Sequence, residues 1–480
     1  LGTWVSSLSH SHIAAMVEFG RQAALGQAAL NDVRALLKCY QDLDPDIKWN
    51  GGLYLDSSLK ERSNVFLIYQ DTYIFGRGFL GTTELKVPVK YKAVRQGDVL
   101  NRPVPWFSIA IVTGDMDQGA EDVIGAQEMI RRYGSADSGG LIKHVIYPNE
   151  SLEEPKAVSD LIAGLADDPL IRVIVVNQAV QGTAEGFRRA KAKRPEILCL
   201  AGEPHEPPDV ISQISELTVH SDFISRGYLI PYAAKSLGAD SLVHVSFDRH
   251  MANETMKLRS LIMKEACRDL GLKYFEEKAP DPAGGAGVDG ARDFIVRHYP
   301  QWVKKYGTKA VFFPTNDAHT EPLLKQMALY GGYFIEADIP STLLGYPGAF
   351  NVNIEPHLGQ WNQILEIVEN AVVESGGSGR MGVWAYPLGF TQTAGLVEFG
   401  KLLVEERASV TDINTFLQCL GMFTPGARWN GSFLNDTLTG RPLRNYFLIY
   451  QDTYIFGQGY IETTKLEVPD KYYSIKLNAK

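Results

Sequence analysis

Asp248-Arg249-His250 is the richest group of chemically capable residues in this sequence. It follows the short apolar run Ser241–Phe247, which is typical of a buried strand. An arginine fork beside an imidazole can bind a carboxylate or a phosphate through paired hydrogen bonds. The same residues could instead form a salt bridge between two lobes, and the sequence leaves both interpretations open.

Polar residues also follow other predicted strands. Thr113-Gly114-Asp115 ends the run Phe107–Val112, whose β-branched residues are typical of a strand buried on both faces. In an open α/β sheet the ligand lies at the carboxyl ends of the strands, beside helix N-termini that attract anions. Further groups of this kind are Asn177-Gln178, Glu203 to His205, Asp281 and Thr315-Asn316-Asp317.

These residues are not accompanied by a recognisable cofactor or catalytic signature. Thr113-Gly114-Asp115 lacks the GxGxxG dinucleotide fingerprint, and no GxxxxGK[ST], GxSxG or HExxH pattern occurs. Histidines spaced i, i+4 and CxxC pairs are also absent, so we expect no metal and four buried, inert thiols at Cys39, Cys199, Cys267 and Cys419. We therefore expect no cofactor, no catalytic residues and no enzymatic activity.

Length and composition bound the class of protein. A chain of 480 residues is too long for one core and suggests two to four domains. A formal net charge of −9 without a Lys/Arg stripe argues against nucleic acid as a partner. We expect no transmembrane segment because no run of about 18 apolar residues occurs. The chain begins with Leu1, so a processed N-terminus and a fragment both stay open.

The beginning of the chain recurs at its end. FLIYQDTYIFG at 66–76 is repeated identically at 447–457, and Trp49-Asn50-Gly51 recurs as Trp429-Asn430-Gly431. Residues 1–100 therefore look like a partial copy of the C-terminal segment. Either the chain is a shortened tandem, or it is the downstream product of a longer one. The two copies could pair about a pseudo-twofold axis.

The elements that must position the polar residues alternate between strands and helices from about residue 106 to 350. This pattern, which includes a short strand at Tyr333–Ile335, predicts two parallel-sheet lobes, followed by a helix over 354–376. Each copy of the repeat is expected to be helical and then β-rich, with the Asn-Gly pair forming a turn ahead of the strands. The predicted organisation is a partial repeat (1–100), lobe 1 (101–222), lobe 2 (223–350), a hinge-crossing segment with closing helices (351–406) and an α+β extension (407–480) that repeats 27–95.

The motifs IAIVTGD, LADDP, VVNQAVQGT, AGEPHE, SFDRHM, KAPDP, TND and GYPGA come in this order along the chain. Together they resemble a family of uncharacterised bacterial proteins within the type I periplasmic-binding-protein superfamily. The resemblance covers about 106–406, and it implies two Rossmann-like, doubly wound lobes joined by a three-strand hinge. Carried over residue by residue, the ligand-binding candidates are Thr113, Asp115, Asn177, Gln178, Glu203, His205, Ser246, Arg249, His250, Asp281, Asn316 and Tyr346.

The resemblance also implies a role. We expect a solute-binding protein that holds a small polar or anionic ligand in the cleft between its lobes. An ABC-transporter permease or a second copy would be its partner, and an extracytoplasmic location follows because relatives are typically exported lipoproteins. The alternative is a structural or assembly protein whose repeated ends mediate oligomerisation, and the identity of the ligand is beyond the sequence.

Overall fold

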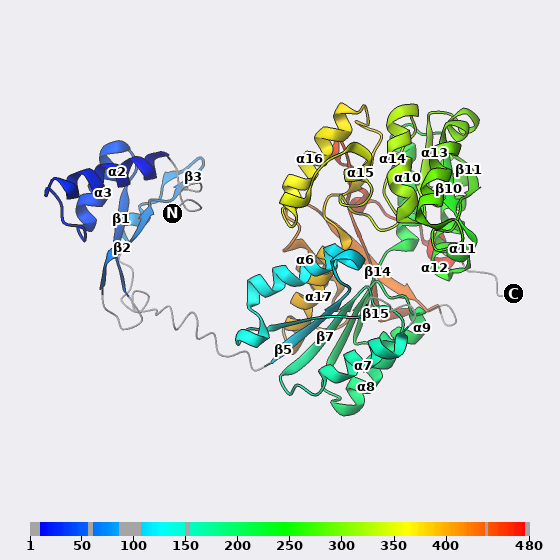
Figure 1. Cartoon of the computed structure of the whole chain (residues 1–480), viewed down its shortest axis with the longest axis horizontal. Coiled ribbons are helices and arrows are strands. Elements are labelled where there is room, and N and C mark those ends of the chain that lie inside the picture. The colour runs from blue at the N-terminus through cyan, green and yellow to red at the C-terminus, as the bar shows by residue number, and fades with distance from the viewer. Residues whose placement is uncertain (1–9, 56–60, 86–106, 149–153, 437–439, 476–480) are drawn as a thin grey trace. The chain divides into compact units, whose positions relative to one another are not determined.

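The structure is a computed structural model that describes residues 10–55, 61–85, 107–148, 154–436 and 440–475. The chain divides into two compact units, residues 1–104 and residues 105–480 (Figure 1). All of the candidate ligand-binding residues belong to the larger unit. Over the described ranges, we find no helix with the length and apolar character needed to cross a membrane.

Lobe 1 of the larger unit is built on a seven-stranded sheet. Its strands are β5 (Ser108–Thr113), β6 (Ile142–Ile146), β7 (Ile171–Asn177), β8 (Leu198–Gly202), β9 (Leu217–Ser221), β14 (Trp429–Asn435) and β15 (Pro442–Gln451). They lie in the order β14-β15-β9-β8-β7-β5-β6, and all neighbours are parallel except β14 and β15. Every residue of β5 is buried, as its β-branched composition predicts.

Helices cover both faces of this sheet. They are α6 (Met116–Tyr133), α7 (Pro155–Leu165), α8 (Thr183–Lys193), α9 (Pro208–Ile211), α17 (Leu388–Val404) and α18 (Ile413–Gly421). α6 and α17 pack together on one face, and α7 and α8 pack together on the other (Figure 1). The first turn of α6 is fixed by a capping box between Asp115 and Gln118.

Lobe 2 has a second parallel sheet, in the order β11-β10-β12. Its strands are β10 (Ser241–Ser246), β11 (Lys273–Lys278) and β12 (Ala310–Pro314). Its helices are α10 (Phe223–Ser236), α11 (Asp248–Ala252), α12 (Glu254–Leu270), α13 (Gly287–Tyr306), α14 (Asp317–Tyr330), α15 (Tyr346–Phe350) and α16 (Trp361–Glu374). The fold class predicted from the sequence, two parallel α/β lobes, is confirmed.

A further small sheet extends lobe 2. It consists of β13 (Gly382–Trp384), β16 (Thr453–Ile455) and β17 (Gly459–Tyr460), all antiparallel. Single parallel bridges join Val311 to Tyr333 and Phe334 to Met381, and so connect β12 with this sheet. The strand expected at Tyr333–Ile335 is thus reduced to two isolated bridges.

The helix expected over 354–376 is also shorter than predicted, since α16 begins only at Trp361. Pro356 lies in a single 3₁₀ turn at Glu355–His357, and Gly359 has a φ of 85°. A proline without an N–H donor and a glycine in the left-handed region both interrupt an α-helix.

Three connections join the lobes: residues 221–223, 384–388 and 451–453. They lie side by side. The Asp222 N–H donates to the Ile449 carbonyl at 2.7 Å. The side-chain amide of Gln451 accepts from the Tyr386 N–H and donates to the Tyr386 carbonyl, both at 3.1 Å. Adjacent connections of this kind can act together as a hinge.

The C-terminal segment is integral to both lobes, although the sequence suggests a separate extension over 407–480. β14 and β15 form one end of the lobe 1 sheet, while β16 and β17 complete the small sheet of lobe 2. β15 pairs with β9 in parallel, with Leu448 opposite His220. The larger unit therefore closes only when this segment is in place.

The smaller unit has the same order of elements as the C-terminal segment. They are α2 (His10–Ala24), α3 (Val33–Leu43), β1 (Trp49–Leu55), β2 (Glu61–Gln70), β3 (Tyr73–Ile74) and β4 (Gly78–Phe79). Its buried core consists of Ala15, Phe19, Leu36, Cys39 and Tyr40. The part of the predicted β-rich region at 86–94 lies outside the described residues.

Asn50-Gly51 does not form the predicted turn, because the pair lies inside β1, where Gly51 is opposite Ile68. The Asn50 side chain accepts from the Gly51 N–H at 2.7 Å and donates to the Thr83 carbonyl at 2.6 Å. A Cβ at Gly51 would lie 2.4 Å from the Leu67 carbonyl oxygen. Glycine is therefore needed here for close strand approach.

Candidate functional site

Asn177 ends β7 and anchors a buried polar network in lobe 1. Its Nδ2 donates to the Asp122 carboxylate at 2.6 Å, to the Thr393 hydroxyl at 2.8 Å and to the Gly389 carbonyl at 3.1 Å. These partners come from α6 and α17. The carboxyl edge of the sheet is thereby tied to the helices that face lobe 2.

Two amide oxygens without a hydrogen-bond partner among the described residues lie together in this network. They are Asn177 Oδ1 and Gln392 Oε1, and both are buried. A Cβ at Gly202 would lie 1.9 Å from the first and 2.7 Å from the second. A buried acceptor without a hydrogen-bond partner costs free energy. The position between these two oxygens therefore favours a chemical group that donates hydrogen bonds.

Glu203 and His205 follow β8, as predicted, but they differ in surroundings. The buried Glu203 carboxylate accepts from the Ser221 N–H at 2.5 Å and from Gln392 Nε2 at 3.2 Å. His205 is exposed, and its Nε2 lies 3.4 Å from Gln178 Oε1. Of these candidates, Glu203 joins the buried network, whereas Gln178 and His205 form a pair at its surface.

Thr113 and Asp115, at the end of β5, serve the local structure. The Thr113 hydroxyl lies 2.7 Å from the Gly114 carbonyl and 2.8 Å from His144 Nε2. Asp115 caps α6 by accepting from the Gln118 N–H at 2.9 Å. Both side chains therefore already have hydrogen-bond partners at the edge where the sequence places a ligand.

Arg249 and Asp281 form a two-pronged ion pair within lobe 2. Arg249 Nε and Nη2 donate to the two Asp281 oxygens, each at 2.8 Å. The interpretation as a salt bridge between lobes is wrong, because α11 and the loop after β11 belong to the same lobe. The arginine that could have clamped a ligand carboxylate already holds one from its own chain.

The other lobe 2 candidates gather at the carboxyl ends of β10 and β12. The buried Ser246 hydroxyl lies 2.7 Å from the Thr315 hydroxyl, and His250 Nδ1 lies 3.2 Å from the same group. Asn316 caps α14 by accepting from the Ala318 N–H at 3.0 Å. The structure thus brings these residues together on one sheet edge, as the strand pattern predicts.

Tyr346 stands apart from the other candidates. Its side chain is buried, and its hydroxyl donates to the Gly382 carbonyl at 2.6 Å. Its ring packs edge-on against Phe456 and Phe334, with centroids 5.0 Å and 6.1 Å away. The side chain is thus part of the core of lobe 2 and does not present an aromatic face to a cleft.

Carboxyl groups from both lobes lie at these sheet edges, and of them only Asp317 belongs to the polar strand-end groups that the sequence predicts. Glu121 of α6 accepts a hydrogen bond from the hydroxyl of Ser341, which belongs to lobe 2, and another from the Gly389 N–H at 3.3 Å. Asp317, the first residue of α14, lies close enough for the charge of Glu121 to act on it. We call Glu121, Asp122, Asp317 and Asp338 the acidic junction.

Burial shifts the protonation of Glu121, Asp122 and Asp317. Burial raises the pKa of Glu121 to about 7, against the hydrogen bonds from Ser341 and Gly389. Burial, with the charges of Asp338 and Glu121, raises the pKa of Asp317 to about 7, and burial with the charge of Glu121 raises the pKa of Asp122 to about 8. These carboxyl groups therefore gain or lose protons near neutral pH.

One buried cation partly balances this charge. Arg259 forms an ion pair with Asp338, and both side chains are largely buried. A second buried pair, Arg226 with Glu336 at 2.6 Å, lies next to it, and the Trp384 indole N–H donates to Glu336 at 2.8 Å. The segment around 336–338 is thus fixed beside the connections between the lobes.

Sequence patterns gave little sign of the acidic junction. Glu121 and Asp122 lie in the first turns of a predicted helix, where acidic residues are common for reasons of helix polarity alone. The strand-end rule finds Asp317 in Thr315-Asn316-Asp317, although Asn316 alone is carried over as a ligand-binding candidate. Asp338 lies in a loop between predicted elements and carries no sequence signal.

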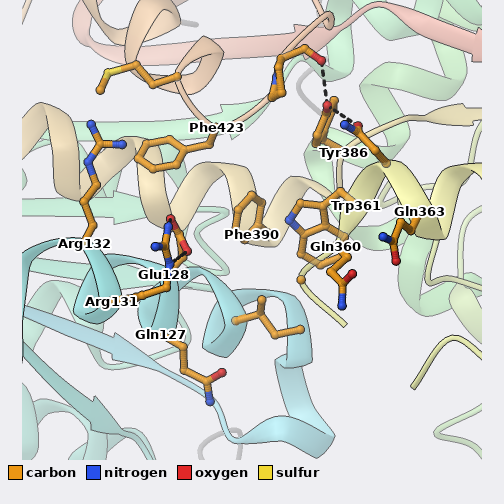
Figure 2. Close-up of a pocket in the computed structure, with 15 residues that line it drawn as sticks. Gln127, Glu128, Arg131, Arg132, Gln360, Trp361, Gln363, Tyr386, Phe390 and Phe423 are labelled. Atoms are coloured by element: carbon orange, nitrogen blue, oxygen red, sulfur yellow. Dashed lines mark hydrogen bonds and ion pairs between the residues drawn. The ribbon is translucent and has the colours of Figure 1, made fainter. Parts of the chain in front are cut away.

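A cavity of about 740 Å³ is lined by residues of α6, α16 and α17 (Figure 2). Gln127 and Arg131 of α6 line it together with Gln360 and Trp361 of lobe 2, and Phe390 of α17 lies between them. The Trp361 and Phe390 ring centroids are 4.8 Å apart. The volume lies within the range of about 300–1,000 Å³ that is usual for small-molecule sites.

No set of three or more His, Cys, Asp and Glu side chains in the described part of the chain is arranged to hold a metal ion. Cys39, Cys199, Cys267 and Cys419 are buried and free. The donor set at the junction consists instead of carboxyl, hydroxyl and amide groups, which can bind a polar organic molecule by hydrogen bonds.

Comparisons with known proteins agree with this architecture. A relative from Treponema pallidum (strain Nichols), an uncharacterised protein, is 40% identical over 217 residues, which are 45% of this chain and 98% of the relative. A solved structure from Clostridium difficile 630, described as a candidate transcriptional regulator, matches with a TM-score of 0.65 at 21% identity, covering 73% of this chain and 99% of that chain. This likeness shows the fold alone.

A sugar ABC transporter protein from Actinomyces odontolyticus ATCC 17982 is also similar, with a TM-score of 0.42 and 8% identity over 64% of this chain and 86% of that chain. A likeness at this level carries no argument. One family model without a description matches both 13–94 and 393–475. The model of a protein of unknown function, DUF3798, matches residues 107–382. The resemblance to an uncharacterised bacterial family is therefore confirmed, and the chain belongs to the DUF3798 family.

Proposed function

We propose that this protein is a non-enzymatic binding protein that holds a small polar solute between its two lobes. The observation that carries the proposal is the hydrogen bond from Ser341 of lobe 2 to Glu121 of lobe 1, beside the carboxyl edge of the lobe 1 sheet. The three adjacent connections support a hinge, about which the two lobes can close on a solute.

The chemistry of the junction favours a solute that donates hydrogen bonds. Asn177 and Gln392 have buried carbonyl oxygens without a hydrogen-bond partner among the described residues, and Glu121 and Asp317 add carboxyl groups. A neutral polyhydroxy solute or an amine satisfies these acceptors, whereas an anion would add a like charge. Of the polar and anionic classes that the sequence leaves open, we therefore propose the polar class, neutral or positively charged.

A thermal-shift screen with amines, amino acids, sugars and nucleosides tests the proposal, because a solute that binds the folded state raises its stability. We expect at least one class to raise the melting temperature by several degrees. At pH 8, Glu121→Gln should weaken the affinity for a positively charged solute at least tenfold. Absence of stabilisation by every class would contradict the proposal.

A matched variant separates the acidic junction from the neighbouring cavity. Trp361→Ala enlarges the cavity of Figure 2, whose lining does not include Glu121 or Asp317. We expect this variant to keep its affinity for a solute that binds at the junction. If affinity is lost in Trp361→Ala and kept in Glu121→Gln, the solute occupies the cavity and the junction assignment is wrong.

The proposal includes an extracytoplasmic location and delivery of the solute to an ABC-transporter permease. Both rest on the resemblance to exported binding proteins, and the absence of a membrane-spanning helix from the described residues is compatible with them. Protease treatment of intact cells tests the location. Degradation of the protein under conditions that spare cytoplasmic markers is the expected result, and full protection would contradict it.

A further inference from the structure

The smaller unit exposes side chains that identical residues of the larger unit bury. Phe75 is 94% exposed, whereas its counterpart Phe456 is fully buried at 0%. Leu67 is 57% exposed, and its counterpart Leu448 is at 0%. Both pairs lie in the eleven-residue segment that is identical in the two copies. The difference is therefore one of surroundings and not of sequence.

The larger unit shows what covers these residues. β15 is paired on one side with β14 and on the other with β9, and Leu448 lies opposite His220. β16 is paired with β13, so that Tyr454 lies opposite Val383. In the smaller unit, β2 is paired with β1 alone, and β3 with β4 alone, among the described residues. Within the described ranges, the edges that meet β9 and β13 in one copy have no partner strand in the other.

The smaller unit already has the conformation of the buried copy. β1 and β2 shift register between Leu53 and Tyr54, and β14 and β15 do so at the corresponding Phe433 and Leu434. The Thr82 N–H donates to Asp71 at 2.7 Å, as the Thr463 N–H donates to Asp452 at 2.7 Å. Little rearrangement is needed for the smaller unit to take the same place, which lowers the cost of docking.

The exposed set continues onto a helix. Met16 and Val17 of α2 are exposed, whereas Leu396 and Val397, their counterparts on α17, are buried between α6 and the lobe 1 sheet. The helix face, the strand edge and Phe75 are thus all groups whose counterparts in the other copy are buried. Exposed apolar groups whose counterparts are buried favour an interaction site on this unit.

We propose that the smaller unit docks on a second polypeptide. This partner has the two DUF3798 lobes but lacks the segment that corresponds to residues 388–475, which we call the closing segment. The lobe pair of the same chain is already closed by residues 388–475, so that place is taken. The matching family models also separate the two parts, since DUF3798 ends at residue 382 and the undescribed family covers both closing segments. The smaller unit docks by strand addition. β2 forms main-chain hydrogen bonds with the partner's counterpart of β9, and β3 does so with its counterpart of β13.

A co-purification experiment with full chains tests this proposal. The acceptor is a tagged chain with L448D and L67D, which disable its own closing strand and its own smaller unit. The donor is the untagged wild-type chain, and the matched control donor carries L67D alone. We expect the wild-type donor to be retained at about one donor per acceptor. Recovery of the L67D donor should fall at least tenfold, because the charge enters the docked strand.

A second acceptor covers the case in which L448D prevents folding. It ends at residue 387 and carries L67D, so it lacks the whole segment from α17 to β17. Retention of the wild-type donor but not of the L67D donor, by either acceptor, supports the proposal. Equal retention of both donors, or retention of neither donor by both acceptors, overturns it. The solute-binding proposal is unaffected by either result, since the donors differ only in the smaller unit.

Discussion

Residues 66–76 and 447–457 have one sequence and two environments. In the larger unit the segment joins the two lobes and lies between β9 and β13, while in the smaller unit it is an exposed hairpin arm. Local features such as the register shift are the same in both copies. The comparison shows that local sequence determines the local shape and that neighbouring strands determine burial.

Replacement of Phe456 and of its counterpart Phe75 should give the largest difference in stability between the two copies. Phe456→Ala removes a ring that is packed against Tyr346, and we expect a loss of about 3–5 kcal/mol in the free energy of unfolding of the larger unit. Phe75→Ala should change stability by less than about 0.5 kcal/mol, because the ring is exposed. Denaturant unfolding of the two variants measures the difference. Equal losses would contradict the burial assignment.

Replacement of the hinge glutamine should give a smaller but clear difference. Gln451→Ala leaves the buried N–H and carbonyl of Tyr386 without partners and should cost about 2 kcal/mol. The counterpart Gln70 is exposed, so Gln70→Ala should be close to neutral. The same denaturant titration checks both variants. A neutral Gln451→Ala would show that the connections are not held together by this side chain.

The acidic junction has no counterpart in the smaller unit, so pH should act on the larger unit. The folded-state pKa of Glu121 is raised to about 7, above its unfolded value near 4.5. The folded state therefore binds more protons, and stability should fall as pH rises from about 4.5 to 7, then level off. Glu121→Gln should raise the melting temperature by a few degrees at pH 8 and weaken this dependence.

Melting curves of wild type and Glu121→Gln at pH 5.5 and 8 check this sign. The variant should gain at pH 8 and change little at pH 5.5, where Glu121 is mostly protonated. A Gln side chain can keep both contacts, since its oxygen can accept from Gly389 and its amide can donate to Ser341. A variant that is destabilised at pH 8 would contradict the assignment.

Removal of the N-cap side chains of α3 and α18 should give the smallest losses of stability, and the two losses should be about equal. Asp32 accepts from the Ala35 N–H at 3.0 Å, and Asp412 accepts from the Thr415 N–H at 3.0 Å. Asp32→Ala and Asp412→Ala should each cost about 1 kcal/mol in their own unit. Denaturant unfolding, followed with a probe in each unit, measures the two losses. Clearly unequal losses would show that the caps depend on tertiary contacts.

The sequence predicts the lobe architecture well because each buried strand is a short β-branched run with a polar end. β5, β7 and β8 lie where the pattern puts them, to within one or two residues. The role of residues 407–480 could not be predicted, because the pairing of β15 with β9 joins segments more than two hundred residues apart. Turn propensity also misled at Asn50-Gly51, where a side-chain bond stabilises a strand instead.

The candidate site could be predicted only in part. Strand-end rules place Asn177 and Glu203 at the correct edge, and Asn177 proves to be the centre of the lobe 1 network. They do not reveal that Arg249 is already paired with Asp281, nor that Glu121 turns toward the other lobe. Such facts depend on how the lobes meet, which no local pattern encodes.

The central claim is that the lobes close on a polar solute, and the distance between them tests it most directly. Spin labels at Lys156→Cys on α7 and Arg297→Cys on α13 are exposed and lie on different lobes, while the native cysteines are buried. We predict that a solute that stabilises the protein shifts the label distances to one narrower, shorter population. Unchanged distances with every stabilising solute would contradict the account.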